Sequence, residues 1–393
     1  MIKTKRKKIL WIEVLSELGG AQLSMCEVCK KLADSDITIE AALPAGPLSD
    51  KLKDAGITVY PISPIRASKK GFAFFTTAAK LLRSPHTVNQ IVRVCKPDLI
   101  HANSLAAFIT TAHVPDTIPV LWHVRDIQKN PQLIRSSIRR AAGIITASEA
   151  IDENLTDMIS RRHLDKLHLV RNGIDASKFS SSDKDQLRSD LDLSQDVPLI
   201  GMVAHIIPWK KHNVFIESAA LIHEKMPEVQ FAIFGRDLFN ENKRYLKQLK
   251  ALVVERGLKE CFYWKDNCSS PEEFIPALDI LIHPPRYEPF GRIICEAMVC
   301  EVPVIATDSA GPATIITDRL NGRLVVDGIA DKFAEIAIEL LQNPPACKAI
   351  TSNAREHILS NYTTERVCRD LIKVYDNVIR KALEYCNFSS DKD

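Results

Sequence analysis

Short apolar runs alternate with longer amphipathic stretches along the whole chain. In the first half these runs lie at 9–15, 37–42, 58–62, 97–104, 120–126 and 144–149. A second series follows at 199–205, 231–236, 278–283 and 302–307. Apolar runs of this length predict buried strands, and the stretches between them carry helical spacing. The alternation predicts an α/β fold built on parallel, doubly wound sheets.

Length and a change in composition predict two domains. The chain has 393 residues, enough for two α/β domains of ordinary size. Residues 177–197 are rich in Ser and Asp, which is typical of a linker. We therefore predict an N-terminal domain over 1–190, a second domain over 191–361, a helix over 362–386 that crosses back to the first domain, and a disordered tail over 387–393.

Charge is unevenly distributed between the two halves. Residues 1–190 hold 28 Lys and Arg against 20 Asp and Glu, while the whole chain has a net charge of only +3. A basic first half favours an anionic acceptor or membrane surface, although scattered solvated charge would give the same count. No apolar run approaches the roughly 20 residues that span a bilayer. Glu13 and Glu17 interrupt the first apolar stretch, which argues against a signal peptide.

Three local patterns invite a functional interpretation, and each has a plainer one. Cys26 and Cys29 form a C-x-x-C inside a helical pattern with no second pair, so we expect reduced structural thiols. The D-x-D at 34–36 falls between a helix and a strand, where a turn is expected. Residues 65–84 mix cations with aromatics, typical of either an interfacial helix or an ordinary crossover helix.

The most informative stretch is 278–300. An apolar strand ends at Pro284 and Pro285, and Pro289 and Gly291 then mark a tight turn. Apolar residues recur afterwards with helical spacing, so the stretch reads as strand, loop and helix. A helix N-terminus presents free N–H groups and the positive end of the helix dipole, which favours an anion such as a phosphate.

Two carboxylates flank this predicted anion site. Glu288 lies in the loop, and Glu296 lies two turns into the helix. A carboxylate only accepts hydrogen bonds, so beside a phosphate its natural partners are sugar hydroxyls. The pair could hold the two sugar-like ends of one nucleotide-sugar. Alternatively, Glu288 is a loop charge and Glu296 pairs with Arg292 at i,i+4.

The residues after this stretch carry a family resemblance. Glu288 and Glu296 form E-x7-E and are followed by P-V-I-A at 303–306, a loop at 309–312 and N-G-x-L-V at 321–325. I-x-x-S-E at 145–149 and V-x-N-G-I-D at 170–175 precede them. The order resembles retaining glycosyltransferases of family 4, also called group 1. That resemblance implies the GT-B fold, in which two Rossmann-like domains face an inter-domain cleft.

The resemblance assigns roles residue by residue. It implies catalytic roles for Glu288, Lys210 and His123. Donor binding is expected from Gly19, Gly20, His205, Lys210, Lys211, Glu288, Phe290, Gly291, Arg292, Ile293 and Glu296. Lys210 would meet the donor diphosphate, Glu288 the transferred sugar and Glu296 the ribose. Polar residues also end two first-half strands, where doubly wound sheets bind ligands, which points to His101, Asn103 and Arg125 on the acceptor side.

Several residues depart from the family pattern. His205 stands where the family has arginine, and Lys211 stands where it has glycine. Glu301 replaces a helix-ending glycine that often needs a positive φ, Ala310 replaces a loop glycine, and Thr314 replaces a glutamate.

The predicted function is metal-independent transfer of a sugar, with retention, from a nucleoside diphosphate sugar to a glycan or lipid-linked acceptor. No cofactor, metal or nucleic acid is expected. Polysaccharide or lipopolysaccharide synthesis follows loosely from the basic first half, as does a cytoplasmic location with peripheral contact at the inner membrane face. Two other classes stay open: a sugar-nucleotide epimerase, and a degenerate GT-B partner subunit that binds a donor without turnover.

Overall fold

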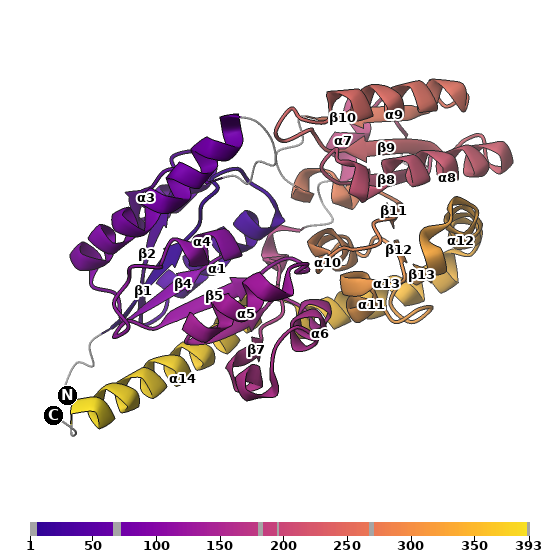
Figure 1. The fold of residues 1–393 in the computed structure, drawn as a ribbon. Coiled ribbons are helices and arrows are strands. Elements are labelled where there is room, and N and C mark those ends of the chain that lie inside the picture. The colour runs from indigo at the N-terminus through magenta and orange to yellow at the C-terminus, as the bar shows by residue number, and fades with distance from the viewer. Residues whose placement is uncertain (1–5, 66–71, 180–183, 195, 267–270, 391–393) are drawn as a thin grey trace. The chain divides into compact units, whose positions relative to one another are not determined.

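The computed structural model describes residues 6–65, 72–179, 184–194, 196–266 and 271–390. Side chains at 72–82, 184–186, 327 and 385–390 lie outside this description. The chain forms two compact units, one of Met1–Asn172 with Thr364–Asp393 and the other of Gly173–Thr363 (Figure 1). The predicted architecture of two doubly wound Rossmann-like domains is confirmed.

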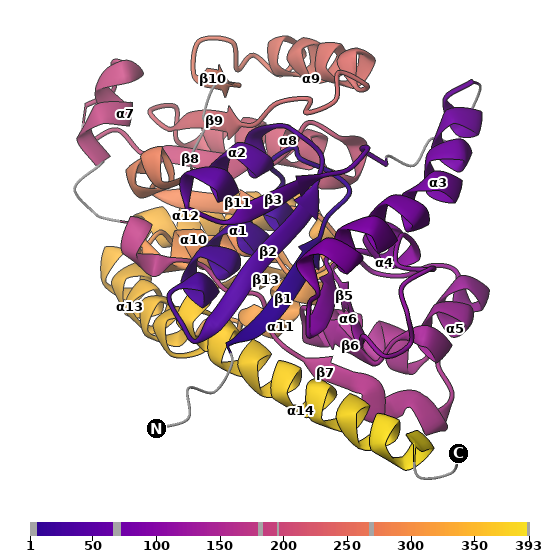
Figure 2. The ribbon, with the colours of Figure 1, turned by 90° about the vertical axis from the view of Figure 1, so that its left-hand side faces the viewer.

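The first unit is built on a seven-stranded parallel sheet of order β3-β2-β1-β4-β5-β6-β7, and Figure 2 shows β1 and β2 of this sheet side by side. The order reverses between β1 and β4, which is the switch point of a doubly wound sheet. Its elements are β1 (Lys7–Ile12), α1 (Gly20–Ala33), β2 (Ile37–Leu43), α2 (Pro47–Asp54), β3 (Thr58–Pro61), α3 (Phe72–Cys95), β4 (Leu99–Ala102), α4 (Leu105–Ile109), β5 (Val120–Val124), α5 (Pro131–Arg140), β6 (Gly143–Thr146), α6 (Glu149–Thr156), η1 (Arg161–Lys166), β7 (Leu167–Leu169) and α14 (Thr364–Ser390).

The second unit repeats the plan with a six-stranded parallel sheet of order β10-β9-β8-β11-β12-β13. Its switch point lies between β8 and β11. The elements are η2 (Ala176–Lys178), α7 (Lys184–Asp190), β8 (Leu199–Val203), η4 (Pro208–Lys210), α8 (His212–Lys225), β9 (Gln230–Phe234), α9 (Lys243–Glu255), β10 (Phe262–Lys265), η5 (Pro271–Glu273), η6 (Ile275–Ala277), β11 (Ile280–His283), α10 (Arg292–Val299), β12 (Val304–Thr307), α11 (Ala310–Ile315), β13 (Arg323–Val325), η7 (Val326–Gly328), α12 (Ala330–Gln342) and α13 (Pro344–Asn361).

Each sheet is buried on both faces, which explains why its strands read as apolar runs rather than as alternating patterns. Successive side chains of a strand point to opposite faces. Ile9 and Trp11 accordingly join one hydrophobic core of the first unit, and Leu10 and Ile12 join the other. The second unit divides in the same way between two cores.

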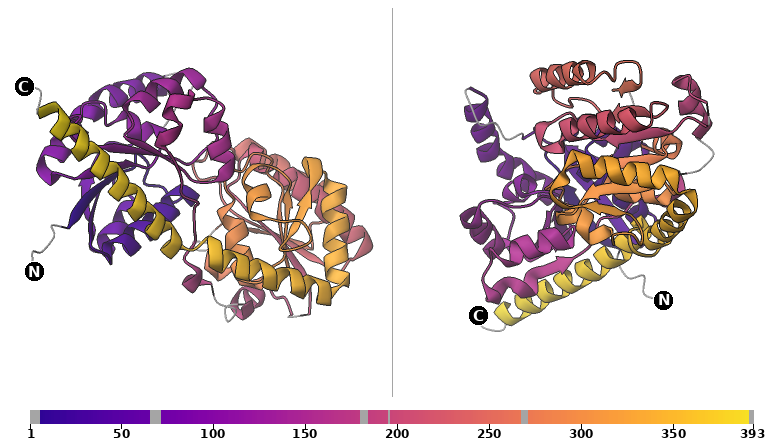
Figure 3. Two further views of the ribbon diagram at one scale, coloured as in Figure 1. Left: turned by 90° about the horizontal axis from the view of Figure 1, so that it is seen from below. Right: turned by 90° about the vertical axis from the view of Figure 1, so that its right-hand side faces the viewer.

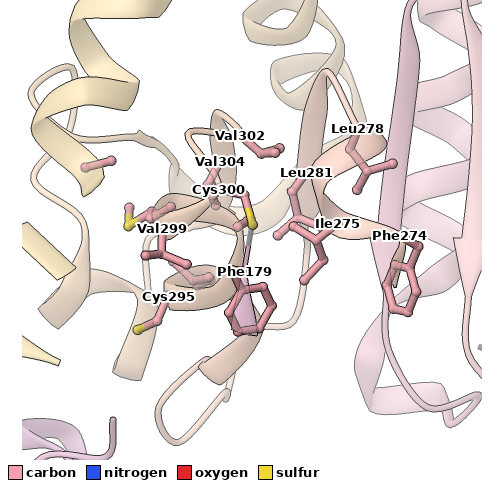
Figure 4. Close-up of a cluster of buried hydrophobic side chains, with 14 of the residues drawn as sticks. Phe179, Phe274, Ile275, Leu278, Leu281, Cys295, Val299, Cys300, Val302 and Val304 are labelled. Carbon is pink, nitrogen blue, oxygen red and sulfur yellow. The ribbon is translucent and has the colours of Figure 1, made fainter. Parts of the chain in front are cut away.

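The first unit ends at Asn172, whereas the sequence placed the domain boundary near residue 190. Residues within the predicted linker explain the difference, because their side chains are buried in a core of the second unit. These include Phe179, Leu187 and Leu191, which pack with residues of η6 and α10. Figure 4 shows Phe179 beside Cys295 and Val299 of α10. The Ser- and Asp-rich segment is therefore partly structured.

The last helix, α14, returns to the first unit. Val367, Leu371, Tyr375 and Val378 are buried in the core that α1 also lines, and the helix runs along that unit in Figure 3. It continues to Ser390 rather than ending near residue 386. The segment after Leu383 contains no Gly or Pro to stop it. Of the predicted tail, residues 391–393 lie outside the described part.

The plainer interpretations of the C-x-x-C and of the D-x-D agree with the structure. Cys26 and Cys29 are buried thiols on α1, and burial raises the pKa of Cys29 well above its usual value. Residues 34–36 form a turn. The second half of α3 packs on the sheet through Val88 and Val92. Residues 66–71 and the side chains of 72–82, on which interfacial docking would depend, lie outside the description.

Three departures from the family glycines adopt left-handed backbone, as the sequence suggested for one of them. Lys211 has φ 61°, Glu301 has φ 58° and Ala310 has φ 49°. A residue with a Cβ pays roughly 1 kcal/mol for this conformation, while glycine adopts it freely.

Glu301→Gly is therefore expected to raise the free energy of unfolding by about 0.5–1 kcal/mol, because Glu301 is exposed and follows Cys300, the C-cap of α10. Urea unfolding measures the change. Glu356→Gly is the control, an exposed residue inside α13, and it should destabilise by about 1 kcal/mol. Equal destabilisation by both substitutions would contradict the assignment of backbone strain to Glu301.

Candidate active site

Two loops at the switch point of the second sheet form the candidate site. One leaves β8 and the other leaves β11, and these two strands are neighbours. Ligands of doubly wound sheets bind where the carboxyl ends of such strands diverge. The β8 loop carries His205, Lys210 and Lys211, and the β11 loop carries Glu288 and Gly291.

The β8 loop is shaped by a short 3-10 turn and a left-handed residue. η4 ends at Lys210, and Lys211 then provides the N-terminal boundary of α8 with φ 61° and ψ 39°. This turn places Lys210 just before the N-terminal end of a 14-residue helix. Its ammonium also lies 4.2 Å from the centre of the Trp209 ring, which is 45% exposed.

The β11 loop is held by close backbone approach. Gly291 has φ 98° and ψ 52° and immediately precedes α10. Gly311 at the start of α11 donates its N–H to the Glu288 carbonyl at 2.9 Å. A Cβ on Gly311 would lie only 2.3 Å from the Phe290 oxygen, so glycine is required there. The loop between β11 and α10 is therefore fixed by α11.

Lys210 and Glu288 form an ion pair across the two loops, with 13% of each side chain exposed. The buried His283 ring ends β11, and its Nε2 lies 3.4 Å from Glu288 Oε2. Burial alone raises the pKa of Glu288. The Lys210 charge and the His283 ring outweigh burial and hold that pKa at about 2. Glu288 is therefore a carboxylate at neutral pH, able to accept hydrogen bonds from hydroxyl groups.

His205 is not a permanent cation like the arginine it replaces. Burial, followed by the charges of Lys210 and Arg236, lowers the pKa of His205 below its usual value. A neutral imidazole can donate a hydrogen bond to a phosphate but brings no charge. The positive charge of this loop consequently comes from Lys210 and Lys211.

The predicted donor-binding residues in α10 and just before it differ in whether the backbone or the side chain is available to a ligand. Phe290 is buried in the core against Tyr362, so only its backbone faces the loop. Arg292 Nε donates to Glu296 Oε1 at 2.6 Å, the i,i+4 pair that was the plainer alternative for Glu296. Glu296 is 2% exposed. Ile293, the next residue of the predicted donor set, is half-buried on the first turn.

The first unit holds the remaining predicted residues. Gly19 precedes α1, and the space that a Cβ on Gly20 would enter is open. Asn103 and Arg125 belong to a buried network at the β1–β4 switch point. Asn103 donates to Glu13 Oε2 at 2.8 Å and accepts from Arg125 Nε at 3.0 Å. Both predicted acceptor residues are therefore engaged inside the unit.

The two histidines of the first unit are in contact. His101 Nε2 lies 2.9 Å from His123 Nδ1, and His101 Nδ1 lies 2.7 Å from the Tyr375 hydroxyl. Both ring nitrogens of His101 thus have partners, so neither is available to bind an acceptor substrate. His123 Nε2 is buried with no partner among the described residues. Of the two, His123 is the one that can reach a ligand.

Sequence reasoning missed three residues of these clusters. His283 was noted only as the end of a strand, although polar residues at such ends were the signal used elsewhere. Glu13 was used only against a signal peptide. Tyr375 lies on α14 and carried no local signal, because its contact with His101 joins residues 274 positions apart.

Within the ranges that the structure describes, no three His, Cys, Asp or Glu side chains gather as a metal ion would require. No helix in the described part of the chain is both long and apolar enough to cross a bilayer.

A parallel doubly wound unit with a cation at its switch point, beside a helix N-terminus, is typical of nucleotide-binding α/β proteins. Residues 18–178 match the model described as Glycosyltransferase Family 4, and residues 183–357 match the model described as Glycosyl transferases group 1. The chain belongs to the group 1 glycosyltransferases, and its fold is GT-B.

Individual relatives are distant. D-inositol 3-phosphate glycosyltransferase 1 of Catenulispora acidiphila is 25% identical over 92% of each chain. Poly(ribitol-phosphate) alpha-N-acetylglucosaminyltransferase of Staphylococcus aureus is 21% identical over 64% of this chain, which spans about half (47%) of that relative. HepE of Anabaena, solved with UDP and glucose, superposes with a TM-score of 0.80 at 22% identity, covering 94% of this chain and 99% of HepE.

Proposed function

We propose that this protein transfers a hexose-type unit from a nucleoside diphosphate sugar to a glycan or lipid-linked acceptor, with retention at the anomeric carbon. The Lys210–Glu288 pair at the second switch point is the observation that carries the proposal. It combines a cation for a diphosphate with a carboxylate for sugar hydroxyls, next to a helix N-terminus. A donor nucleotide-sugar lying across both loops would contact the cation, the carboxylate and the helix N-terminus.

Each residue then has a chemical task. Lys210 stabilises the charge that develops on the diphosphate leaving group as the glycosidic bond breaks. Glu288 orients the transferred sugar, and Glu296 accepts from the ribose hydroxyls. His123 donates to a sugar oxygen. We propose that this set acts without a metal ion, because Lys210, Lys211 and the start of α10 supply positive charge to the phosphates.

UDP-hexoses are the first donors to test, since HepE was solved with UDP and glucose. A role in cell-surface polysaccharide synthesis is supported by a lipopolysaccharide core mannosyltransferase of Rhizobium meliloti, which is 22% identical over 78% of this chain. The basic first half agrees with an anionic or lipid-linked acceptor. The cytoplasmic location and the contact with the inner membrane face remain predictions.

A thermal-shift panel of UDP-, GDP-, ADP- and CDP-sugars without metal tests donor binding. A ligand that binds only the native state raises Tm, by about 2.7 kcal/mol of added stability at one hundred times Kd. We expect a clear response to a UDP-sugar at millimolar concentration and none to at least two of the other bases. A flat panel would contradict the proposal. Binding without turnover for any acceptor would instead favour a non-catalytic partner subunit, and product formed without acceptor would favour an epimerase.

A further inference from the structure

Three buried polar side chains form a continuous hydrogen-bonded chain in the first unit. It runs from Tyr375 on α14 through His101 at the end of β4 to His123 at the end of β5. Tyr375 and His101 are fully buried, and His123 is 1% exposed. The Trp11 ring stacks on His101 at 3.6 Å between ring centres and 12° between planes, which fixes the orientation of that imidazole. We refer to Tyr375, His101 and His123 as the histidine relay.

Each hydrogen bond of the relay contains one proton, and the two imidazoles have one N–H each when neutral. Burial, followed by the nearby Arg125 charge, lowers the pKa of both histidines well below the usual value, so both are neutral at physiological pH. Burial raises the pKa of Tyr375 well above its usual value, so its hydroxyl keeps its proton. The relay therefore has two directions in which its protons can be arranged.

The Tyr375 hydroxyl selects between the two directions. A buried O–H requires an acceptor. The Trp11 N–H beside this hydroxyl can only donate, so of its two described partners His101 Nδ1 is the acceptor. If Tyr375 donates there, the His101 proton lies on Nε2 and is donated to His123 Nδ1. The His123 proton then lies on Nε2. In the opposite direction the Tyr375 proton would have no acceptor among the residues that the structure describes.

The last atom of the relay is His123 Nε2. His123 Nε2 is buried, and no described residue accepts from it. It belongs to a residue at the carboxyl end of a parallel strand, where ligands of such sheets bind. A buried N–H without an acceptor is costly, and an oxygen acceptor supplied by a ligand would remove that cost.

We propose that Tyr375 and His101 are positioning residues that fix His123 as an Nε2–H donor toward a sugar oxygen of the bound substrate. This inference rests on the proposed function for the identity of the ligand, while the tautomer itself depends only on the first unit. It gives α14, the last helix of the chain, a part in the active site through a hydrogen bond rather than through packing alone. Without the relay, His123 would present Nε2 as a donor in only part of the population.

Long-range ¹H–¹⁵N NMR on the histidine-labelled full chain reads the tautomers directly, with resonances assigned by their loss in His101→Gln and His123→Gln. Both rings are expected as Nε2–H tautomers in the wild type. Tyr375→Phe should introduce the Nδ1–H form and lower kcat about fivefold, with unchanged affinity for UDP. Tyr60→Phe, which loses a hydroxyl bonded to Glu40 in the same unit, should change neither the tautomers nor kcat.

A second pair of variants covers the case in which Tyr375→Phe does not fold. His101→Gln keeps an N–H close to the position of Nε2 and should retain more activity than His101→Leu. The relay is overturned if wild-type His123 carries its proton on Nδ1, if Tyr375→Phe and Tyr60→Phe have equal kcat, or if the two His101 variants are equally active. Nε2–H tautomers in a protein that binds no nucleotide-sugar would support the relay while contradicting the proposed function.

Discussion

Lys210→Ala is expected to lower kcat for sugar transfer by about 10² to 10³ and to weaken UDP binding at least tenfold. The ammonium of Lys210 is the fixed charge closest to the carboxylate proposed to hold the transferred sugar. A cation placed where charge develops on a leaving group stabilises the transition state more than the ground state, so kcat should fall more than affinity. Steady-state kinetics and calorimetric UDP titration measure the two effects. Lys225→Ala, an exposed lysine at the other end of α8, is the matched control and should leave both unchanged.

Removing Lys210 also changes stability, and that effect has to be separated from catalysis. With its pKa near 2, Glu288 stabilises the wild-type fold above its unfolded pKa of about 4.5, and this contribution is lost as the pH falls through about 2. In Lys210→Ala the cation that lowers this pKa is absent, so a largely buried carboxylate is left unpaired. The free energy of unfolding of the variant should be about 3 kcal/mol lower than that of the wild type at neutral pH. It should also fall less on acidification.

Neutralising both partners separates the two roles of Lys210. Lys210→Met combined with Glu288→Gln removes both charges and should regain most of the lost stability, because neither group is then buried as an unpaired ion. Glu288→Gln alone should bind UDP normally, since UDP carries no sugar for Glu288 to hold. The affinity of the double variant for UDP should remain as low as that of Lys210→Ala, because the Lys210 cation is absent from both. Normal UDP affinity in the double variant would show that Lys210 acts only by balancing the charge of Glu288.

The strands and the loop that carries Glu288 were predictable because their signals are local. Each strand is a buried apolar run, and the Glu288 loop follows one such strand with proline and glycine at its turns. The positive φ of Glu301 was also foreseeable, because glycine at such a helix end is often left-handed and Glu301 stands in its place. The domain boundary was not foreseeable. Residues 177–197 are rich in Ser and Asp, yet a few apolar residues among them are buried in a core of the second unit.

Contacts between distant segments could not be predicted from one sequence. Glu13, Asn103 and Arg125 come from three different strand ends, and only the sheet order brings them together. The ion pair of Lys210 with Glu288 depends in the same way on β8 lying next to β11. The residue types of Asn103, Arg125 and His123 each suggested contact with a ligand. Asn103 and Arg125 instead hydrogen-bond to one another. His123 Nε2 has no partner among the described residues. Which polar strand end serves the fold and which serves a ligand is decided by these partners.

Glu296→Ala is expected to weaken UDP binding by about ten- to one-hundredfold. The carboxylate is buried and accepts from Arg292, and a carboxylate can accept from ribose hydroxyls at the same time through its remaining lone pairs. A hydrogen bond to a charged group contributes roughly 1.5–3 kcal/mol, which gives the expected range. Calorimetric titration of UDP measures the loss, with Glu356→Ala on the exposed face of α13 as the control.

The nucleotide itself distinguishes a ribose contact from a structural ion pair. 2′,3′-Dideoxy-UDP lacks the hydroxyls that Glu296 is proposed to bind, so the wild type should bind it about as weakly as Glu296→Ala binds UDP. Against this ligand Glu296→Ala should lose nothing further, because the interaction is already absent. If Glu296 serves only to hold Arg292 and the first turns of α10, the substitution will instead weaken both nucleotides by the same factor. That result would restore the i,i+4 pair as the whole role of Glu296.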